Sequence, residues 1–272
     1  MFVCREYFYY CFRVVQRYRK CGQLLMIGCP CADMQLEDYQ KRWAEKPVLR
    51  KIYSDQYRRM DQAALDGDTL EIGGGIGNLK MGGNGRLIKS DIQCSANVDV
   101  ATDAQSLAFA SAVFSNIVLF DVLHHLQCPL LFFAEAERVL KPGGRVIMVE
   151  PGITPVSKLL LKMFHYEAVE LDWDVLAPCE VDVKKDPYES NQAIPTILFK
   201  RNPDLFLHTV RGFQIVRSEW LSLFAYPLSG GFYPWSFIPE KWVSRVLQIE
   251  DKLLPFLGQL MAFRMMVVLE KK

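Results

Sequence analysis

An acidic residue followed by three spaced glycines is the part of this sequence best suited to bind a ligand. In Leu-Glu-Ile-Gly-Gly-Gly-Ile-Gly, residues 70–77, Glu71 precedes Gly73, Gly75 and Gly77. We expect a buried apolar strand to end just before the glycines, which let the backbone take positive φ and approach a ligand closely. Such a loop presents N–H groups to its ligand. Glu71 would favour a cationic group and repel a pyrophosphate.

The spacing of the glycines separates two classes of nucleotide-binding protein. A dinucleotide-binding turn has the pattern G-x-G-x-x-G, but here the third glycine comes one residue early and Asn78 stands where that pattern has glycine. The spacing therefore disfavours an NAD-dependent oxidoreductase. A doubly wound sheet also places an acidic residue at the end of its second strand, where it holds ribose hydroxyls. Asp91, twenty residues after Glu71, matches that position. Alternatively, Asp91 caps the next segment.

The order of the motifs that follow resembles the class I S-adenosylmethionine-dependent methyltransferases. The first motif of that family is E-x-G-x-G-x-G, which residues 71–77 match. An Asp-Ala pair and a Leu-x-Phe follow at residues 103–104 and 107–109, with alanine replacing the family's usual proline in the latter. The sequence Arg-Val-Leu-Lys-Pro-Gly-Gly at 138–144 completes the series. The resemblance covers roughly residues 68–152. One mild departure is Ser-Asn at 115–116, where the family usually shows Phe-Asp.

This resemblance implies a fold, a cofactor and a reaction. The fold is a doubly wound, mostly parallel α/β sheet of the Rossmann-like kind, and the cofactor is S-adenosyl-L-methionine. In the family the aspartate of the Asp-Ala pair accepts from the adenine amine, which assigns Asp103 and Ala104, with Asp99 as an alternative acceptor. The carbonyl of Phe120 or the side chain of Asp121 would meet the methionine amine.

Three further residues are candidates for proton transfer. A methyl group on a sulfonium is already electrophilic, so binding, alignment and exclusion of water supply much of the acceleration. A general base is needed only where the acceptor must lose a proton. His124 and His125 follow the fourth expected strand, and Glu150 ends the fifth. The family often carries histidines here without a catalytic role, so an ordinary structural role is the alternative for each.

Charge and cysteine content exclude several other functions. A net charge of +1 in 272 residues gives no electrostatic case for nucleic-acid binding. No run of 18 apolar residues predicts a transmembrane helix, and the N-terminus lacks the apolar stretch of a secretory signal. The expected location is the cytoplasm. The eight cysteines include no C-x-x-C pair, so we expect reduced thiols and no metal site.

The composition divides the chain into an extension and one domain. Residues 1–33 do not resemble the family. Three interpretations are open for them: a poorly ordered extension, a segment upstream of a natural start at Met34, or an amphipathic helix that lies on a membrane or partner. Residues 34–272 form a single methyltransferase domain. Within it we expect a cofactor-binding core over 68–152, a cap and substrate region over 153–260, and a last strand at 262–270.

Several local elements are predicted from periodicity and turn residues. Helices over 36–65 should break near Pro47, and the glycine-rich crossover at 78–86 has room for only a stub of helix. The stretch Glu-Arg-Val-Leu-Lys-Pro-Gly-Gly at 137–144 should end a helix and turn into the fifth strand. Further expected elements are a fourth strand from 116, a fifth over 145–150, a helix over 158–166, a loop over 182–191, a sixth strand at 212–216 and a helix from about 239 to 257.

The region before the last strand is rich in aromatic residues and defines the expected acceptor. Such an insert lines a pocket for a lipidic or aromatic substrate, touches a membrane surface, or forms a satellite core. Its aromatics are Trp220, Phe224, Tyr226, Phe232, Tyr233, Trp235, Phe237 and Trp242, and polar residues to watch in the cap are His165, Tyr166, Glu167, Asn191 and Gln192. We expect methyl transfer to a small, partly apolar molecule. The alternatives are a non-catalytic binding protein with this fold and, less favoured, an NAD-dependent oxidoreductase.

Overall fold

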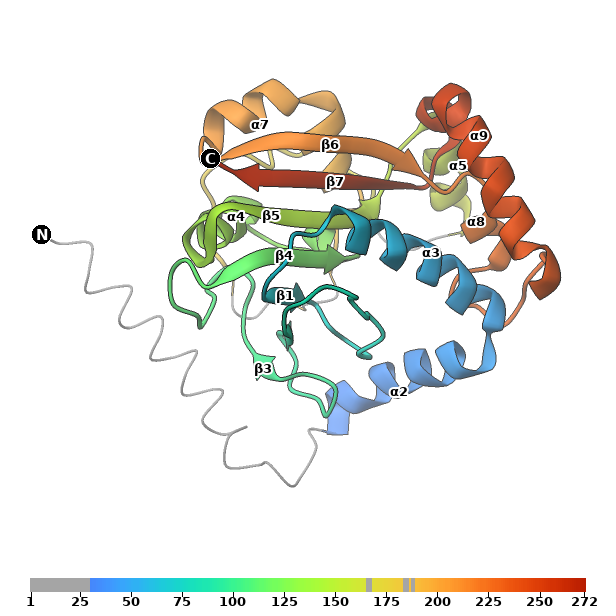
Figure 1. Ribbon diagram of the computed structural model, residues 1–272. Coiled ribbons are helices and arrows are strands. Elements are labelled where there is room, and N and C mark those ends of the chain that lie inside the picture. The colour runs from blue at the N-terminus through green and yellow to red at the C-terminus, as the bar shows by residue number, and fades with distance from the viewer. Residues whose placement is uncertain (1–29, 165–167, 183–185, 187–188) are drawn as a thin grey trace, which may run out of the picture.

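A seven-stranded sheet forms the centre of the computed structural model, which describes residues 30–164, 168–182, 186 and 189–272 (Figure 1). The strand order is β3-β2-β1-β4-β5-β7-β6, and every pairing is parallel except those of β7. The predicted mostly parallel, doubly wound sheet is confirmed. The strands are β1 (Thr69–Ile72), β2 (Leu87–Asp91), β3 (Val100–Ala101), β4 (Phe114–Phe120), β5 (Leu140–Pro151), β6 (Phe213–Leu221) and β7 (Arg264–Lys271).

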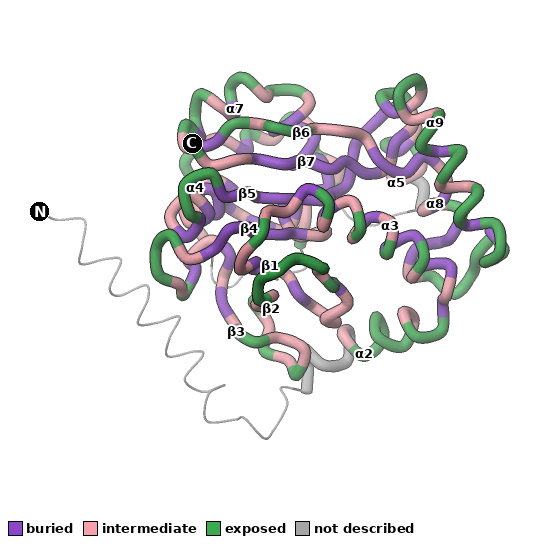
Figure 2. Tube along the Cα trace, viewed as in Figure 1, coloured by how far each residue is buried: buried purple, intermediate pink, exposed green. Residues whose placement is uncertain are grey.

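Helices cover both faces of this sheet, as a parallel sheet requires. Alternate residues of β4 point to opposite faces. Ile117 and Leu119 pack under α4 and α7, whereas Val118 packs with Met60 of α3 on the other face. Figure 2 shows that the central strands are mostly buried. The helices are α2 (Pro30–Glu45), α3 (Pro47–Ala63), α4 (Pro129–Val139), α5 (Pro155–Phe164), α6 (Ile194–Thr196), α7 (Pro203–Thr209), α8 (Ala225–Ser229) and α9 (Val243–Met261), with turns η1 (Leu123–His125), η2 (Ile197–Arg201) and η3 (Glu240–Trp242).

The first two described helices meet at Pro47, where the break was predicted. Proline suits the first turn of a helix, because its missing N–H has no partner there in any case. The preceding Lys46 donates to the carbonyls of Gly231 and Tyr233 at 2.6 and 2.7 Å, and burial lowers the pKa of its ammonium to about 8. The helix junction is therefore fastened to the aromatic insert. Helix α2 begins at Pro30, inside the stretch expected to be an extension.

One local prediction was wrong. No helix forms between β1 and β2, where a stub was expected; the chain there runs through Gly82, Gly83 and Gly85. The helix end expected within 137–144 does form there, because α4 ends at Val139. Leu140 pairs with Phe114, but the pairing with β4 is then interrupted and resumes at Arg145, and Gly143 has a φ of 74°. The glycines therefore make the turn that leads into the regular part of β5.

The parallel strands end on the side of the molecule where the cap lies. In Figure 1 the arrows of β4 and β5 point towards α3, α5, α8 and α9. The chain between β6 and β7 forms α8, η3 and α9, which is where the insert was expected. None of the described helices is both long and apolar enough to span a bilayer. The ligand site of an open α/β sheet lies at this carboxyl edge.

Candidate active site

The glycine loop after β1 has a conformation that only glycine adopts readily. Gly73, Gly75 and Gly77 have φ values of 72°, 46° and 74°. A Cβ on Gly73 would lie 2.2 Å from a methyl group of Val122, which follows β4. The loop is thus packed directly against the end of the neighbouring strand, and its open backbone faces the carboxyl edge of the sheet.

Glu71 carries the clearest sign of a missing partner. Its side chain is 7 % exposed, and its Oε2 has no hydrogen-bond partner within the described part of the chain. Burial raises the pKa of this carboxyl to about 8; Lys89 opposes that rise, and Asp91 and Asp99 add to it. A buried acceptor without a donor is costly. A cation or an N–H donor at this position would therefore stabilise the ionised form.

Asp91 joins the end of β2 to the glycine loop. Its Oδ2 accepts from the backbone N–H of Gly75 at 2.9 Å, and its Oδ1 accepts from that of Gln93 at 2.8 Å. Burial raises the pKa of this carboxyl, while the backbone donors act against the rise. The fold therefore places Glu71, the glycines and Asp91 at one edge, although they come from two strands.

Asp103 and Ala104 follow β3, where the resemblance places the adenine. The Oδ1 of Asp103 accepts from both the backbone and side-chain nitrogens of Gln105, at 2.8 and 3.2 Å, and Ala104 is buried in the main core. The alternative acceptor, Asp99, instead accepts from the backbone N–H of Lys89 at 2.9 Å. This contact engages Asp99 with β2.

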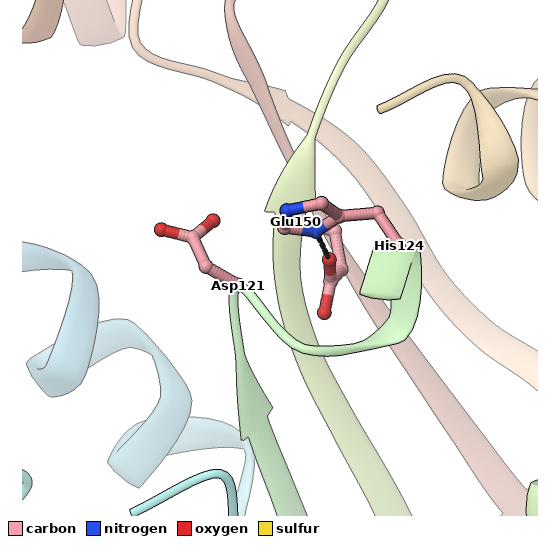
Figure 3. A group of neighbouring side chains, drawn as sticks. All are labelled: Asp121, His124 and Glu150. Carbon is pink, nitrogen blue, oxygen red and sulfur yellow. Dashed lines mark hydrogen bonds and ion pairs between the residues drawn. The ribbon is translucent and has the colours of Figure 1, made fainter. Parts of the chain in front are cut away.

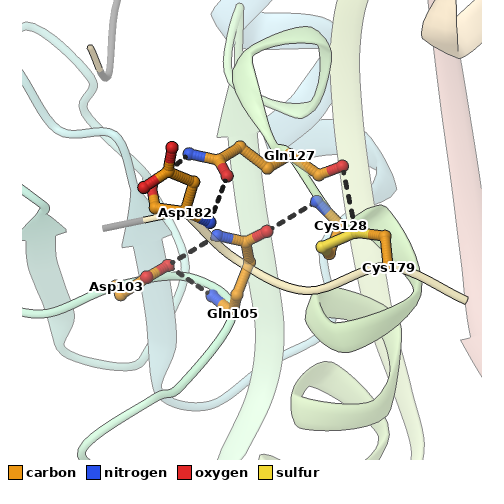
Figure 4. Close-up of a disulfide and its surroundings, with 6 residues drawn as sticks. All are labelled: Asp103, Gln105, Gln127, Cys128, Cys179 and Asp182. Carbon is orange, nitrogen blue, oxygen red and sulfur yellow. Dashed lines mark hydrogen bonds between the residues drawn. A yellow bond between two sulfur atoms is a disulfide. The ribbon is translucent and has the colours of Figure 1, made fainter. Parts of the chain in front are cut away.

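A disulfide lies beside the Asp103 segment and corrects the expectation that all cysteines are reduced thiols. Cys128 and Cys179, 51 residues apart, are bonded (Figure 4). Gln105 accepts from the backbone N–H of Cys128 at 2.7 Å, so a hydrogen-bonded chain connects Asp103 to the disulfide. The sequence showed no spacing that marked this pair.

Asp121 forms an ion pair with an arginine of the last strand. Both terminal nitrogens of Arg264 donate to the Asp121 carboxylate, each at 2.7 Å. The guanidinium also lies over the rings of Tyr226, Phe120 and Tyr53, at 4.3, 4.9 and 5.5 Å. Asp121 has a φ of 57°, which is rare outside glycine and typical of positions held by their surroundings. The end of β4 is therefore fixed in an aromatic, charge-balanced setting.

His124 and Glu150 bind each other below this edge. Their Nδ1 and Oε2 are 2.7 Å apart, and the residues are 3 % and 1 % exposed (Figure 3). The Oε1 of Glu150 accepts from the backbone N–H groups of Val122 and Leu123, at 2.9 and 2.7 Å. The pair therefore holds η1 in place. His125, the third base candidate, is less deeply buried than His124 and stacks against it, with ring centroids 4.2 Å apart.

Asp121, His124 and Glu150 also offer atoms within 4.8 Å of one another that could ligate a metal. The carboxylate of Asp121 is directed away from the other two side chains in Figure 3 and is neutralised by Arg264. The Glu150 oxygens accept three hydrogen bonds from the η1 segment. We interpret the group as a hydrogen-bonded support of the strand ends.

Of the polar cap residues singled out in the sequence, the structure describes Asn191 and Gln192. His165, Tyr166 and Glu167 lie outside the described residues. Asn191 is buried and makes structural hydrogen bonds: its side chain accepts from and donates to the backbone of Glu170 at 2.9 Å. Gln192, the next residue, is also buried.

Comparisons with known proteins agree with this geometry. A family model described as a methyltransferase domain matches residues 84–148. A SAM dependent methyltransferase from Archaeoglobus fulgidus is similar in structure, with a TM-score of 0.50 and 14 % identity over 82 % of this chain and 94 % of that chain. Geranyl diphosphate C-methyltransferase from Streptomyces coelicolor A3(2) has a TM-score of 0.51 and 12 % identity over 86 % and 83 % of the two chains. No curated protein matches the sequence.

The matched segment and the fold agree with the class of protein that the sequence motifs resemble. The family match spans β2, β3 and β4. Asp91 and Phe120 are the last residues of β2 and β4, and Asp103 follows β3. The similar structures share the fold. The chain therefore has the fold of the class I S-adenosylmethionine-dependent methyltransferases, and part of it matches the methyltransferase-domain model. The residues present fit that cofactor, because the unpartnered Glu71 carboxylate and the glycine loop suit a cationic ligand that must approach the main chain.

Three residues important for the site were missed in the sequence. Arg264 interrupts the predicted last strand as a single charge before Met-Met-Val-Val, and a charge in an apolar strand was a usable signal for a buried partner. Gln105 lies two residues after Asp103, a spacing at which side chains often bind locally. Tyr53 lies in the helix expected after Pro47, and no local signal indicated that its ring would lie against Arg264.

Proposed function

We propose that the protein transfers a methyl group from S-adenosylmethionine to a small, partly apolar acceptor. The observation that carries this proposal is the buried, unpartnered carboxylate of Glu71 beside the glycine loop. In this proposal Glu71 and the loop receive the methionine end of the cofactor, Asp91 the ribose, and Asp103 with Ala104 the adenine. Phe120 and Asp121 border the methionine amine. When bound, the cofactor supplies an electrophilic methyl group on a sulfonium.

The acceptor side of the site is proposed from its aromatic residues. Tyr53 and Tyr57 of α3, Phe120 at the end of β4, and Phe232 of the insert contact one another, with ring centroids 4.8 to 5.9 Å apart along the chain of contacts. These side chains come from the cap and from the sheet edge. Such a lining excludes water and favours an apolar acceptor body.

Proton removal, where the acceptor requires it, is assigned to His125. His124 and Glu150 are almost fully buried and bonded to each other, so they support η1 and position its last residue. Replacing His125 with alanine should then slow transfer to hydroxyl or amine acceptors about a hundredfold or more and leave cofactor affinity unchanged. Equal rates of methyl transfer in the variant and wild type would indicate that His124, His125 and Glu150 have only a structural role.

The acceptor class is tested by following formation of S-adenosylhomocysteine with panels of candidate acceptors. We expect turnover with small molecules that join an apolar body to one nucleophilic atom, and none with RNA, DNA or unfolded protein. Efficient methylation of a nucleic acid or a protein side chain would contradict the proposal. Cofactor binding without turnover on any panel would favour the non-catalytic alternative, and binding of NAD in its place would favour an oxidoreductase.

A further inference from the structure

The outer side of α9 carries large apolar side chains that the core does not use. Trp242, just before the helix, and Ile249, Phe256 and Leu260 within it are 46, 52, 82 and 50 % exposed. Their spacings of seven, seven and four residues place them on one side of a helix with 3.6 residues per turn. In Figures 1 and 2 this helix lies on the outside of the molecule, at the carboxyl edge of the sheet.

The opposite side of α9 already provides its packing. Val243 joins a buried cluster with Val48 and Ile52 of α3. Gly258 lies so close to Trp220 of β6 that a Cβ there would come within 2.9 Å of its side chain. The orientation of the helix is therefore fixed from inside, and the exposed apolar side chains are not needed to hold it.

Three acidic residues around α9 have partners on other elements. Glu250 is buried and accepts from backbone N–H groups at the start of α8. Asp251 forms an ion pair with Arg59 of α3 at 2.6 Å, and Glu240 forms one with Lys51 of α3 at 2.9 Å. The negative charges near this helix thus serve its attachment to α3.

Basic groups lie on the outer side instead. Arg245 and Lys252 are exposed, and their spacing from Ile249 places them beside the apolar stripe. The Arg245 guanidinium lies over the Trp242 ring at 5.2 Å, which joins one cation to the aromatic end of the stripe. The outward face of this helix consequently combines apolar area with positive charge.

The aromatic insert, which precedes this helix along the chain, also carries exposed rings. Trp235 and Phe237 are 44 and 75 % exposed, and their ring centroids lie 5.0 Å apart. Only two residues separate Phe237 from η3, which leads directly into α9. Aromatic rings with exposed faces are enriched where proteins meet the headgroup layer of a bilayer.

We propose that this surface docks on an anionic lipid bilayer, with α9 lying in the plane of the interface. We call it the α9 docking face and define it by Trp242, Arg245, Ile249, Lys252, Phe256 and Leu260. An apolar stripe bordered by lysine and arginine is the pattern of interfacial helices, whose apolar side enters the acyl boundary while the cations meet negative headgroups. The proposal is independent of which acceptor is methylated.

A second copy of the chain suits this surface less well. In a two-fold dimer the same patch faces itself, so the stripe of one copy would lie on the stripe of the other. Arg245 and Lys252 would then approach their own counterparts without acidic partners, since the acidic residues nearby are turned toward α3 or buried. An anionic bilayer would instead place negative headgroups opposite Arg245 and Lys252.

The test is flotation of the full chain with vesicles of phosphatidylcholine, with and without about 30 % phosphatidylserine. Wild type should bind the anionic vesicles, and added salt should weaken the binding. The double variant I249S/F256S should lose about tenfold or more in binding to them. The variant R245Q/K252Q should lose about tenfold and its preference for phosphatidylserine as well.

Matched controls separate this surface from a general effect of substitution. Leu205 is 53 % exposed on α7, and Lys141 is exposed at the start of β5. Leu205→Ser and Lys141→Gln should bind as wild type does. Absence of binding by wild type, or equal binding by all variants, would overturn the proposal. A dimer in light scattering that I249S/F256S abolishes, in a protein that ignores vesicles, would overturn it in favour of a second copy.

Discussion

Arg264, at the start of the last strand, donates two hydrogen bonds of 2.7 Å to Asp121, which follows β4 and lies 143 residues earlier. The arginine is 3 % exposed, and its charge is shared between the carboxylate and three aromatic rings. The pair joins the cofactor edge of the sheet to the antiparallel strand and to the cap helices.

Breaking one half of this pair should destabilise the protein strongly. Arg264→Met leaves a partly buried carboxylate without its partner, and the expected loss is about 3–5 kcal/mol in the free energy of unfolding. The double variant D121N/R264M should lose less than the two single variants together, because neither charge is then left alone. Urea unfolding of the four proteins measures the coupling. Additive losses would show that the ion pair contributes nothing beyond packing.

The conformation of the glycine loop predicts a contrast between two alanine variants. Gly73 has positive φ and no room for a Cβ, so Gly73→Ala should cost about 1–3 kcal/mol of stability and weaken cofactor binding. Gly83 has open space around it and lies in the crossover, so Gly83→Ala should behave as wild type. Thermal unfolding and cofactor titration measure both effects. Equal behaviour of the two variants would contradict the loop geometry.

The raised pKa of Glu71 predicts a pH-dependent stability. The folded carboxyl titrates at about 8, above its ordinary value of 4.5. Between these values the unfolded chain binds fewer protons than the folded one, so stability falls as pH rises through this window. Glu71→Gln should remove that fall, which is on the order of 5 kcal/mol for such a shift. Unfolding by urea from pH 5 to 9 compares the two proteins, and identical pH profiles would show that Glu71 is not desolvated.

The same carboxyl predicts the effect of a bound cation. A positive group beside Glu71 favours its ionised form, so ligand binding should displace its proton below pH 8. Calorimetry in buffers of different ionisation enthalpy measures that release. The Glu71→Gln variant is the control, because the ligand's own amine titrates in the same range but does so in both proteins. Equal proton release from the variant and wild type would place the cation elsewhere.

The disulfide predicts a measurable dependence on reductant. Closing a loop of 51 residues should contribute about 2–4 kcal/mol through the unfolded state. Cys128→Ser or Cys179→Ser should therefore lower the urea midpoint of unreduced protein to the value that wild type shows with reductant. Cys94→Ser, at an exposed cysteine outside this disulfide, should change nothing. Alkylation that finds Cys128 and Cys179 as thiols in untreated protein would contradict the bond.

The outline of the fold and the cofactor edge could be predicted because they depend on local patterns. Glycine spacing, an acidic residue after an apolar run and the order of these motifs lie within short stretches, and β1, β2 and β4 formed where expected. The break at Pro47 was equally local, since proline acts on its own turn.

Contacts between distant segments could not be predicted in the same way. Nothing near Asp121 indicates that Arg264 will pair with it, and nothing near Cys128 indicates Cys179, because both partners are brought together by the strand order and the cap.

The most direct test of this account is calorimetric titration of S-adenosylmethionine and S-adenosylhomocysteine into wild type and Asp91→Ala, with NAD as the control ligand. We expect micromolar binding of both adenosyl compounds to wild type, a loss of at least about tenfold in Asp91→Ala from the missing ribose hydrogen bonds, and no binding of NAD. Failure of both adenosyl compounds to bind a folded wild-type protein would contradict the central claim that this edge of the sheet holds the methyl donor.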